Sequence, residues 1–151
     1  MLKAVFDSTT LVSAFLRKQG VAAQLLDFAV KGAFAFYLAP AIIEETCDVL
    51  FHRKHLRSNF SYTDQDVEEY GALLRAFARP VTHLPAIQVC RDPNDDYVIA
   101  TALAASASHI VTRDKDLLDL KNYQDVQMIR PEEFIHLVRK QSPQASSTKA
   151  L

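Results

Sequence analysis

Short apolar runs alternate along the chain with longer segments whose apolar residues recur at helical spacing. The short runs, rich in Val, Ile and Phe, are typical of buried parallel strands and fall at 2–6, 34–38, 110–112 and 126–129, with a weaker candidate at 81–84. The longer segments predict helices at 11–17, 21–31, 40–55, 63–78, 93–107 and 132–139. Strands separated by helices favour right-handed crossovers. The pattern therefore predicts an α/β fold: a three-layer α/β/α sandwich with a mainly parallel central sheet.

Proline and aspartate mark the start of one helix with particular clarity. Asp92 followed by Pro93 is typical of an N-cap residue and a first helical residue. Asp95 then falls in the first turn, where a negative charge complements the helix dipole. Asp114 can cap a short turn over 115–118 in the same way, and Asp7 can cap the first helix. Each of these carboxylates thus has a structural explanation beside any chemical one.

Length and composition favour one globular domain without extreme charge. The chain has 151 residues, a net charge of −1 and two cysteines. We expect a single domain over 1–140 and a disordered tail over 141–151, where Ser, Gln and Lys dominate. A net charge near zero gives no overall attraction to nucleic acid, so binding to nucleic acid would need a local patch of positive charge. The absence of a signal peptide, of a run of about 20 apolar residues and of a disulfide framework predicts a cytoplasmic protein with no membrane span.

Acidic residues provide the candidate chemistry. Asp7 and Asp114 each follow a predicted strand, and the carboxyl ends of parallel strands meet at one edge of a sheet. Asp96 shares a helix side with Ala100 and Leu103, the face expected to pack on the sheet, so we expect it to point toward the same edge. Gathered carboxylates repel one another unless a hard cation such as Mg²⁺ neutralises them. The pattern predicts a metal-dependent hydrolase.

Four segments in one chain resemble the PIN domain, a PilT N-terminus-like nuclease family that includes many toxins of toxin–antitoxin pairs. The segments are 5–14, 42–50, 91–102 and 110–118, and the resemblance covers about 2–137. It implies hydrolysis of RNA phosphodiester bonds with one or two Mg²⁺ or Mn²⁺ ions. Carried over residue by residue, the catalytic and metal-binding acids are Asp7, Glu45, Asp96 and Asp114.

The resemblance also implies supporting residues. Thr112 matches a small hydroxyl residue of the site, and Asp116, four residues further along, is a second supporting candidate whose simpler interpretation is a solvated surface acid. Thr9 stands where the family usually has Asn, which puts the strength of metal positioning in question. Helical periodicity alone does not choose between Glu44 and Glu45. The resemblance favours Glu45.

Partners follow from the same resemblance: an RNA substrate, a small antitoxin protein and a second copy in a homodimer. Arg53 and Lys54, in a basic cluster at a helix end, and Arg113 are candidates for contacts to phosphate. Cations at a helix carboxyl end also complement its dipole, which is the simpler explanation of the cluster.

The same residues bear on several other functions. A dinucleotide-binding module needs a glycine-rich first turn, and the chain has only three glycines. An aspartyl phosphotransferase would place a second acid where Thr9 stands. Two alternatives stay open: a catalytically silent PIN-like binding module, and a housekeeping nuclease acting on RNA or single-stranded DNA.

Overall fold

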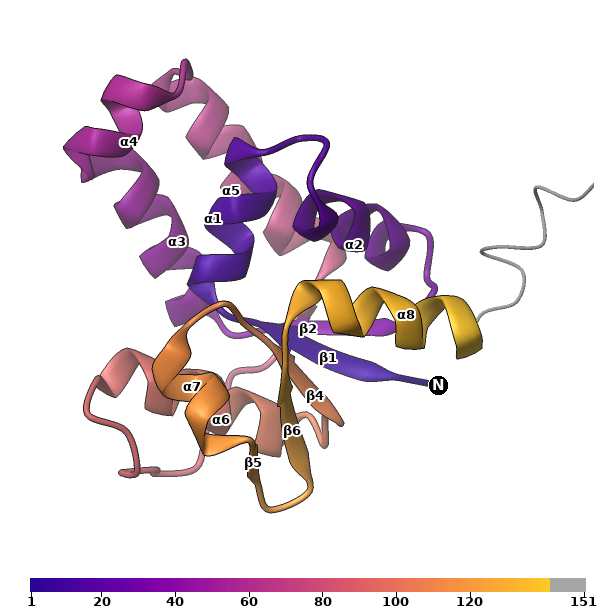
Figure 1. Cartoon of the computed structure of the whole chain (residues 1–151). Helices are drawn as coiled ribbons and strands as arrows, with labels where there is room; N and C mark the ends of the chain where they lie inside the picture. Colours follow the sequence, from indigo (N-terminus) through magenta and orange to yellow (C-terminus); the bar gives the residue numbers. More distant parts are fainter. Residues whose placement is uncertain (142–151) are drawn as a thin grey trace, which may run out of the picture.

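The computed structural model describes residues 1–141 and contains a six-stranded sheet with helices on both faces (Figure 1). The strands lie in the order β3-β2-β1-β4-β6-β5. Their bounds are β1 Lys3–Phe6, β2 Ala35–Leu38, β3 Arg79–Pro80, β4 His109–Val111, β5 Asn122–Tyr123 and β6 Val126–Ile129. Neighbouring strands pair in parallel except β5 and β6, which are antiparallel. The mainly parallel sheet expected from the sequence is confirmed.

The described helices form the two outer layers. Their bounds are α1 Ser8–Leu16, α2 Val21–Val30, α3 Pro40–His52, α4 Lys54–Asn59, α5 Asp64–Phe77, α6 Pro93–Ala104, α7 Lys115–Leu120 and α8 Pro131–Gln141. Figure 1 shows α1, α2, α3, α5 and α8 above the sheet, with α6 and α7 below it. This arrangement confirms the three-layer sandwich. Of the tail expected at 141–151, Gln141 ends α8 and the remainder lies outside the described residues.

The central strands bring two chain segments to one edge of the sheet. Ala4, Val5 and Phe6 of β1 have no exposed surface, because β1 is paired on both sides and covered on both faces. In the parallel register Phe6 lies opposite Val111, the last residue of β4. The backbone amide of Asp7 continues this ladder by donating to the carbonyl of Val111 at 3.2 Å. The residues that follow β1 and β4 are therefore neighbours.

One predicted helix is divided in the structure. The helix expected over 40–55 ends at His52, because Arg53 has an extended backbone (φ −78°, ψ 109°), and α4 begins at Lys54. The Arg57 side chain stabilises this break by donating to the carbonyls of Phe51 at 3.3 Å and Tyr62 at 3.0 Å. The Arg57 side chain, on α4, thus provides hydrogen-bond donors for these two carbonyls, and the apolar pattern of the sequence gives no sign of these bonds.

Other differences occur at element ends. The first helix begins at Ser8, three residues earlier than expected, because Asp7 is its N-cap. The weak strand expected at 81–84 is wrong, since the edge strand β3 is Arg79–Pro80. The two-residue strand β5 was not anticipated, and the expected turn at 115–118 is the helix α7.

The described residues bear on the expectations about a membrane span and about disulfides. No helix among them is long and apolar enough to cross a membrane. Cys47 and Cys90 are both free thiols, in agreement with the expected lack of a disulfide framework.

Candidate active site

Asp7 is the buried centre of the acidic site. It is 3% exposed and accepts hydrogen bonds from the Thr10 amide at 3.1 Å and from the Thr9 hydroxyl at 2.8 and 2.9 Å. The Thr112 hydroxyl donates to the same carboxylate at 2.5 Å. Burial nevertheless raises the pKa of Asp7, although these hydrogen bonds oppose the shift. The Thr9 hydroxyl thus orients Asp7 from the position where the family usually has Asn.

Thr112 connects Asp7 to the second acidic segment. Its hydroxyl donates to Asp7 and accepts from the backbone amide of Asp114 at 2.9 Å. Asp114 in turn caps α7 by accepting from the Asp116 amide at 2.9 Å. One buried hydroxyl therefore fixes the acids that follow β1 and β4 relative to each other.

Asp95 joins these acids from the start of α6. It is 7% exposed, and one carboxylate oxygen from each of Asp95, Asp114 and Asp116 lies within 4.8 Å of the others. Burial, first of all, and the negative charges of Asp114, Asp92 and Asp7 together raise the pKa of Asp95 to about 7. A proton shared within this group, or a cation, relieves the repulsion.

Glu45 approaches from the opposite side, on α3. Its side chain is half-buried, whereas its neighbour Glu44 is exposed. Burial raises the pKa of Glu45; a hydrogen bond with Ser8 opposes this shift, while the charges of Asp92 and Asp7 add to it. The structure therefore places Glu45, and not Glu44, beside Asp7.

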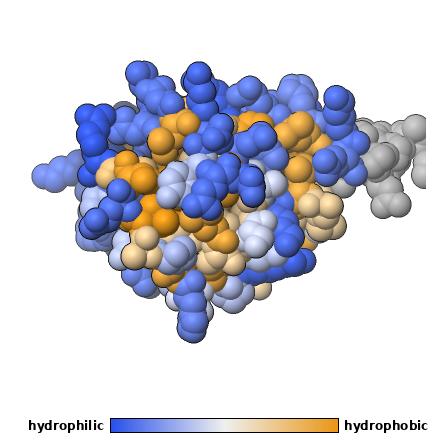
Figure 2. Space-filling view, turned by 90° about the horizontal axis from the view of Figure 1, so that it is seen from below, coloured by the Kyte–Doolittle hydropathy of each residue, from blue (hydrophilic) through white to orange (hydrophobic). Residues whose placement is uncertain are grey.

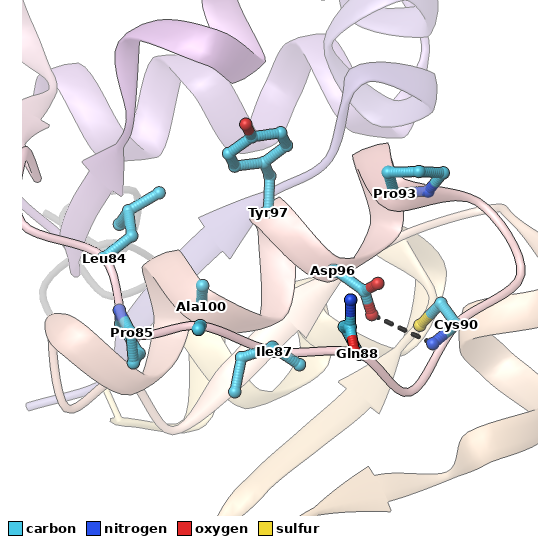
Figure 3. A pocket seen from close by; sticks show the side chains of 10 residues that line it. Leu84, Pro85, Ile87, Gln88, Cys90, Pro93, Asp96, Tyr97 and Ala100 are labelled. Carbon is cyan, nitrogen blue, oxygen red and sulfur yellow. Dashed lines mark hydrogen bonds between the residues drawn. The ribbon is translucent and has the colours of Figure 1, made fainter.

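The structure corrects the placement of Asp96. The prediction that this carboxylate points toward Asp7 and Asp114 is wrong. Its Oδ1 atom accepts from the backbone amides of Val89 at 3.1 Å and Cys90 at 2.9 Å, so it holds the loop before α6 (Figure 3). Successive helical residues differ by about 100° in direction, and it is Asp95 that faces the acids.

The site's composition fits a hard divalent cation. Its donor atoms are carboxylate and hydroxyl oxygens, the ligand type that Mg²⁺ and Mn²⁺ prefer. Among residues 1–141, no Lys, Arg or His forms an ion pair with Asp7, Glu45, Asp95 or Asp114. Burial raises the pKa of Asp7, Glu45 and Asp95, and the charges of neighbouring acids add to the rise at Glu45 and Asp95. Asp95, Asp114 and Asp116 have oxygen atoms close enough together to hold one ion, and Asp7 lies beside them.

A family model of the PIN domain matches residues 3–116, which include every acid of the site. The chain belongs to the PIN domain family. PIN domains have a nuclease-type fold and are generally metal-dependent nucleases, so the acidic group lies where divalent-metal chemistry is expected. The chain is also similar to an uncharacterised protein of Methanocaldococcus jannaschii, with 28% identity over 123 residues, 80% of this chain and 76% of that protein.

The cations predicted to contact phosphate lie in two parts of the PIN domain, Arg113 before α7 and Arg53 with Lys54 between α3 and α4. Arg113 donates to both carboxylate oxygens of Glu132 at 3.2 and 2.7 Å, and so ties the segment before α7 to α8. Arg53 and Lys54 are exposed at the junction of α3 and α4. Arg53 is the C-cap of α3, eight residues after Glu45, which corresponds to about 12 Å at 1.5 Å per residue. Among the described residues none of the three forms an ion pair with Asp7, Glu45, Asp95 or Asp114.

The PIN site also contains residues that sequence reasoning did not assign to it, above all Asp95. A signal for Asp95 was present: Ile99 and Ala102 follow it at i+4 and i+7, and both have no exposed surface. The equivalent partners of Asp96 are Ala100, which lines the hollow shown in Figure 3, and Leu103, which is only partly buried. Ser8, Asn94 and Asp92 complete the surroundings of Glu45.

Proposed function

We propose that this chain is a divalent-metal-dependent endoribonuclease and the toxin of a toxin–antitoxin pair. The observation that carries the nuclease part is the convergence of Asp7, Glu45, Asp95 and Asp114, acids without protein counter-charges in the described chain. Membership of the PIN domain family supports phosphodiester hydrolysis. The RNA preference and the toxin role rest on resemblance to that family.

In the proposed reaction each acid has a separate task. Asp7, Asp95 and Asp114 would hold one or two Mg²⁺ or Mn²⁺ ions, with Asp116 supporting them. The bound ion supplies positive charge that stabilises the phosphate oxygens in the transition state and makes water more acidic. Glu45, whose pKa is raised by burial, would accept a proton from the attacking water. Thr9 and Thr112 orient Asp7.

Cleavage of RNA by the purified protein tests the nuclease proposal. We expect single-stranded RNA to be cut in Mg²⁺ or Mn²⁺, with 5′-phosphate and 3′-hydroxyl ends, and to stay intact with a chelator. Single-stranded DNA of the same sequence tests the housekeeping alternative. Lack of cleavage under all conditions would support a silent binding module.

Metal binding should stabilise the folded protein. A ligand at 100 times its dissociation constant adds about 2.7 kcal/mol to the free energy of unfolding. For a chain of this size we expect Mn²⁺ to raise the melting temperature by about 5–10 °C. The Asp95→Asn, Asp114→Asn double variant should show no such rise. The matched control is Asp119→Asn, an exposed acid on α7 that pairs with Lys115, which should respond like the wild type.

Growth tests the toxin proposal. Expression of the chain alone should slow growth of a bacterial host, and Asp95→Asn should remove this effect. Co-expression of a small antitoxin protein should restore growth. Normal growth alongside cleavage in vitro would instead indicate a housekeeping nuclease.

We also propose a homodimer. Val30 on α2 and Leu73 on α5 are 56% and 50% exposed, and both line a hollow between these helices and α1. Apolar side chains exposed together favour association. Light scattering that gives the mass of a single chain would contradict this expectation.

A further inference from the structure

A second feature of α6 lies on the side of the helix away from Asp95. A hollow of about 650 Å³ separates α6 from the loop that precedes it (Figure 3). Its volume is in the range of small-molecule sites. This hollow is called the base hollow, after the ligand inferred for it. Residues from the loop and from α6 line it, among them Leu84, Ile87, Gln88, Cys90, Asp96 and Tyr97.

The loop that forms one wall is held in place from two directions. Asp96 accepts from the backbone amides of Val89 and Cys90, and Arg91 donates to Asp116 at 3.1 Å. The first contact ties the loop to α6 and the second ties it to α7, beside the acids. The base hollow is therefore formed before any ligand binds, and its wall is linked to the acidic site.

Tyr97 presents an aromatic ring at the base hollow. The ring stands out from α6 in Figure 3, and the side chain is 47% exposed although Val98, Ile99 and Ala100 beside it are buried. Gln88, across the hollow, is exposed and has no hydrogen-bond partner among the described residues. An aromatic face and an amide that both donates and accepts are suited to a flat heterocycle with polar edges.

The charge of the base hollow disfavours a phosphate group. Asp96 is the charged side chain among its lining residues, and no Lys, Arg or His is among them. Hydrophobic residues reach the surface between hydrophilic ones on the face of the molecule seen from below (Figure 2). An uncharged ring would bind here without the repulsion that a phosphate would meet.

The two sites are close along one helix. Tyr97 follows Asp95 by two residues, which corresponds to a rise of about 3 Å and a rotation of about 200° around α6. A strand whose phosphate lies at the acids can therefore reach the base hollow by crossing the N-terminal turn of α6, which is about 10–12 Å across with its side chains. We infer that the base hollow binds one unpaired nucleobase of the substrate near the cleaved phosphate, with Tyr97 stacking on it and Gln88 contacting its edge. This inference rests on the proposed nuclease function.

Equilibrium binding tests the inference without relying on cleavage. The probes are short single-stranded RNAs that carry one abasic nucleotide at successive positions, measured by fluorescence anisotropy in the presence of chelator. The wild type should lose about 5- to 100-fold in affinity at one position. Tyr97→Ala should bind intact RNA more weakly than the wild type by a similar factor. Its affinity should not fall again when the nucleotide at that same position is abasic. Tyr97→Phe, which keeps the aromatic face, should bind like the wild type.

The outcomes separate the inference from the nuclease proposal. The inference is overturned, even if RNA is cleaved, when Tyr97→Ala and wild type bind intact RNA with equal affinity. It is also overturned when the abasic nucleotide lowers the affinity of both proteins by the same factor. A position-specific penalty that disappears in Tyr97→Ala supports it, whether or not the metal-loaded protein cleaves. A Tyr97→Ala variant that loses only a protein partner shows that the hollow binds protein and overturns the inference.

Discussion

Replacing Asp95 with Asn should reduce metal-dependent RNA cleavage by at least about 100-fold while making the metal-free protein more stable at neutral pH. The carboxylate is buried among other acids, so its charge costs free energy in the folded state. Its pKa is about 7 in the fold against 3.8 ordinarily, which means that the folded state binds the proton more tightly. The stability of the metal-free wild type should therefore fall as pH rises from about 4 to about 7. Asp95→Asn should flatten this fall.

Asp96→Asn is the matched control, because it changes the next residue in the same way. Asp96 contacts the loop and not the acids, so its variant should keep the stabilisation by Mn²⁺. Faster amide exchange at Val89 and Cys90 should report the weakened loop instead. Thermal melts across pH, with and without Mn²⁺, measure both variants. Loss of the Mn²⁺ effect in Asp96→Asn but not in Asp95→Asn would return the metal site to Asp96.

Thr112→Val should lower the free energy of unfolding by about 2–3 kcal/mol, since hydrogen bonds to charged groups contribute about 1.5–3 kcal/mol. Thr112 is fully buried, and valine has nearly its shape but no hydroxyl. The substitution leaves an oxygen of Asp7 and the amide of Asp114 without their shared partner. The pKa of Asp7 should rise further, because the Thr112 hydrogen bond that opposes the rise is lost, so metal affinity should fall, and fall more at lower pH. Denaturant unfolding and Mn²⁺ titration at several pH values measure these effects.

Two controls separate the hydroxyl from the methyl group. Thr112→Ser keeps the hydroxyl and should lose only about 1 kcal/mol for the missing methyl. Thr46→Val removes another fully buried hydroxyl, which donates only to the Ile42 carbonyl one turn earlier in α3, and should change stability little. A Thr112→Val variant as stable as Thr112→Ser would contradict the bridging role.

Much of the fold was predictable because its central strands are strongly apolar. The runs that became β1, β2, β4 and β6 have no competing helical periodicity, and the helices between them require parallel pairing. The break at Arg53 was not predictable, because it is stabilised by hydrogen bonds from the Arg57 side chain to backbone carbonyls, which leave no mark on the apolar pattern of the sequence. The two-residue strands β3 and β5 are too short to leave a periodic signal.

The site was predictable where topology alone positions a residue. Asp7 is the residue directly after β1, and Asp114 is the third residue after β4. Because β1 and β4 are neighbours, their ends bring the two aspartates together in any sheet of this order. Asp96 was misplaced because α6 is buried on several sides, against the sheet and against the preceding loop. A helix with two apolar faces gives no single direction for the core. Tertiary contacts of the loop decide which aspartate faces the acids.

Backbone amides at the starts of α1, α6 and α7 provide the carboxylates with partners of their own. Asp7, Asp92 and Asp114 are the N-cap residues of these helices, and each accepts a hydrogen bond from a backbone amide within its helix. These bonds form as the chain folds, independently of any ion. We therefore expect folding and metal loading to be separate events, unlike in a zinc finger, where the ion is required for folding. A cell could then store the folded protein in an idle form whose activation follows the supply of divalent ions.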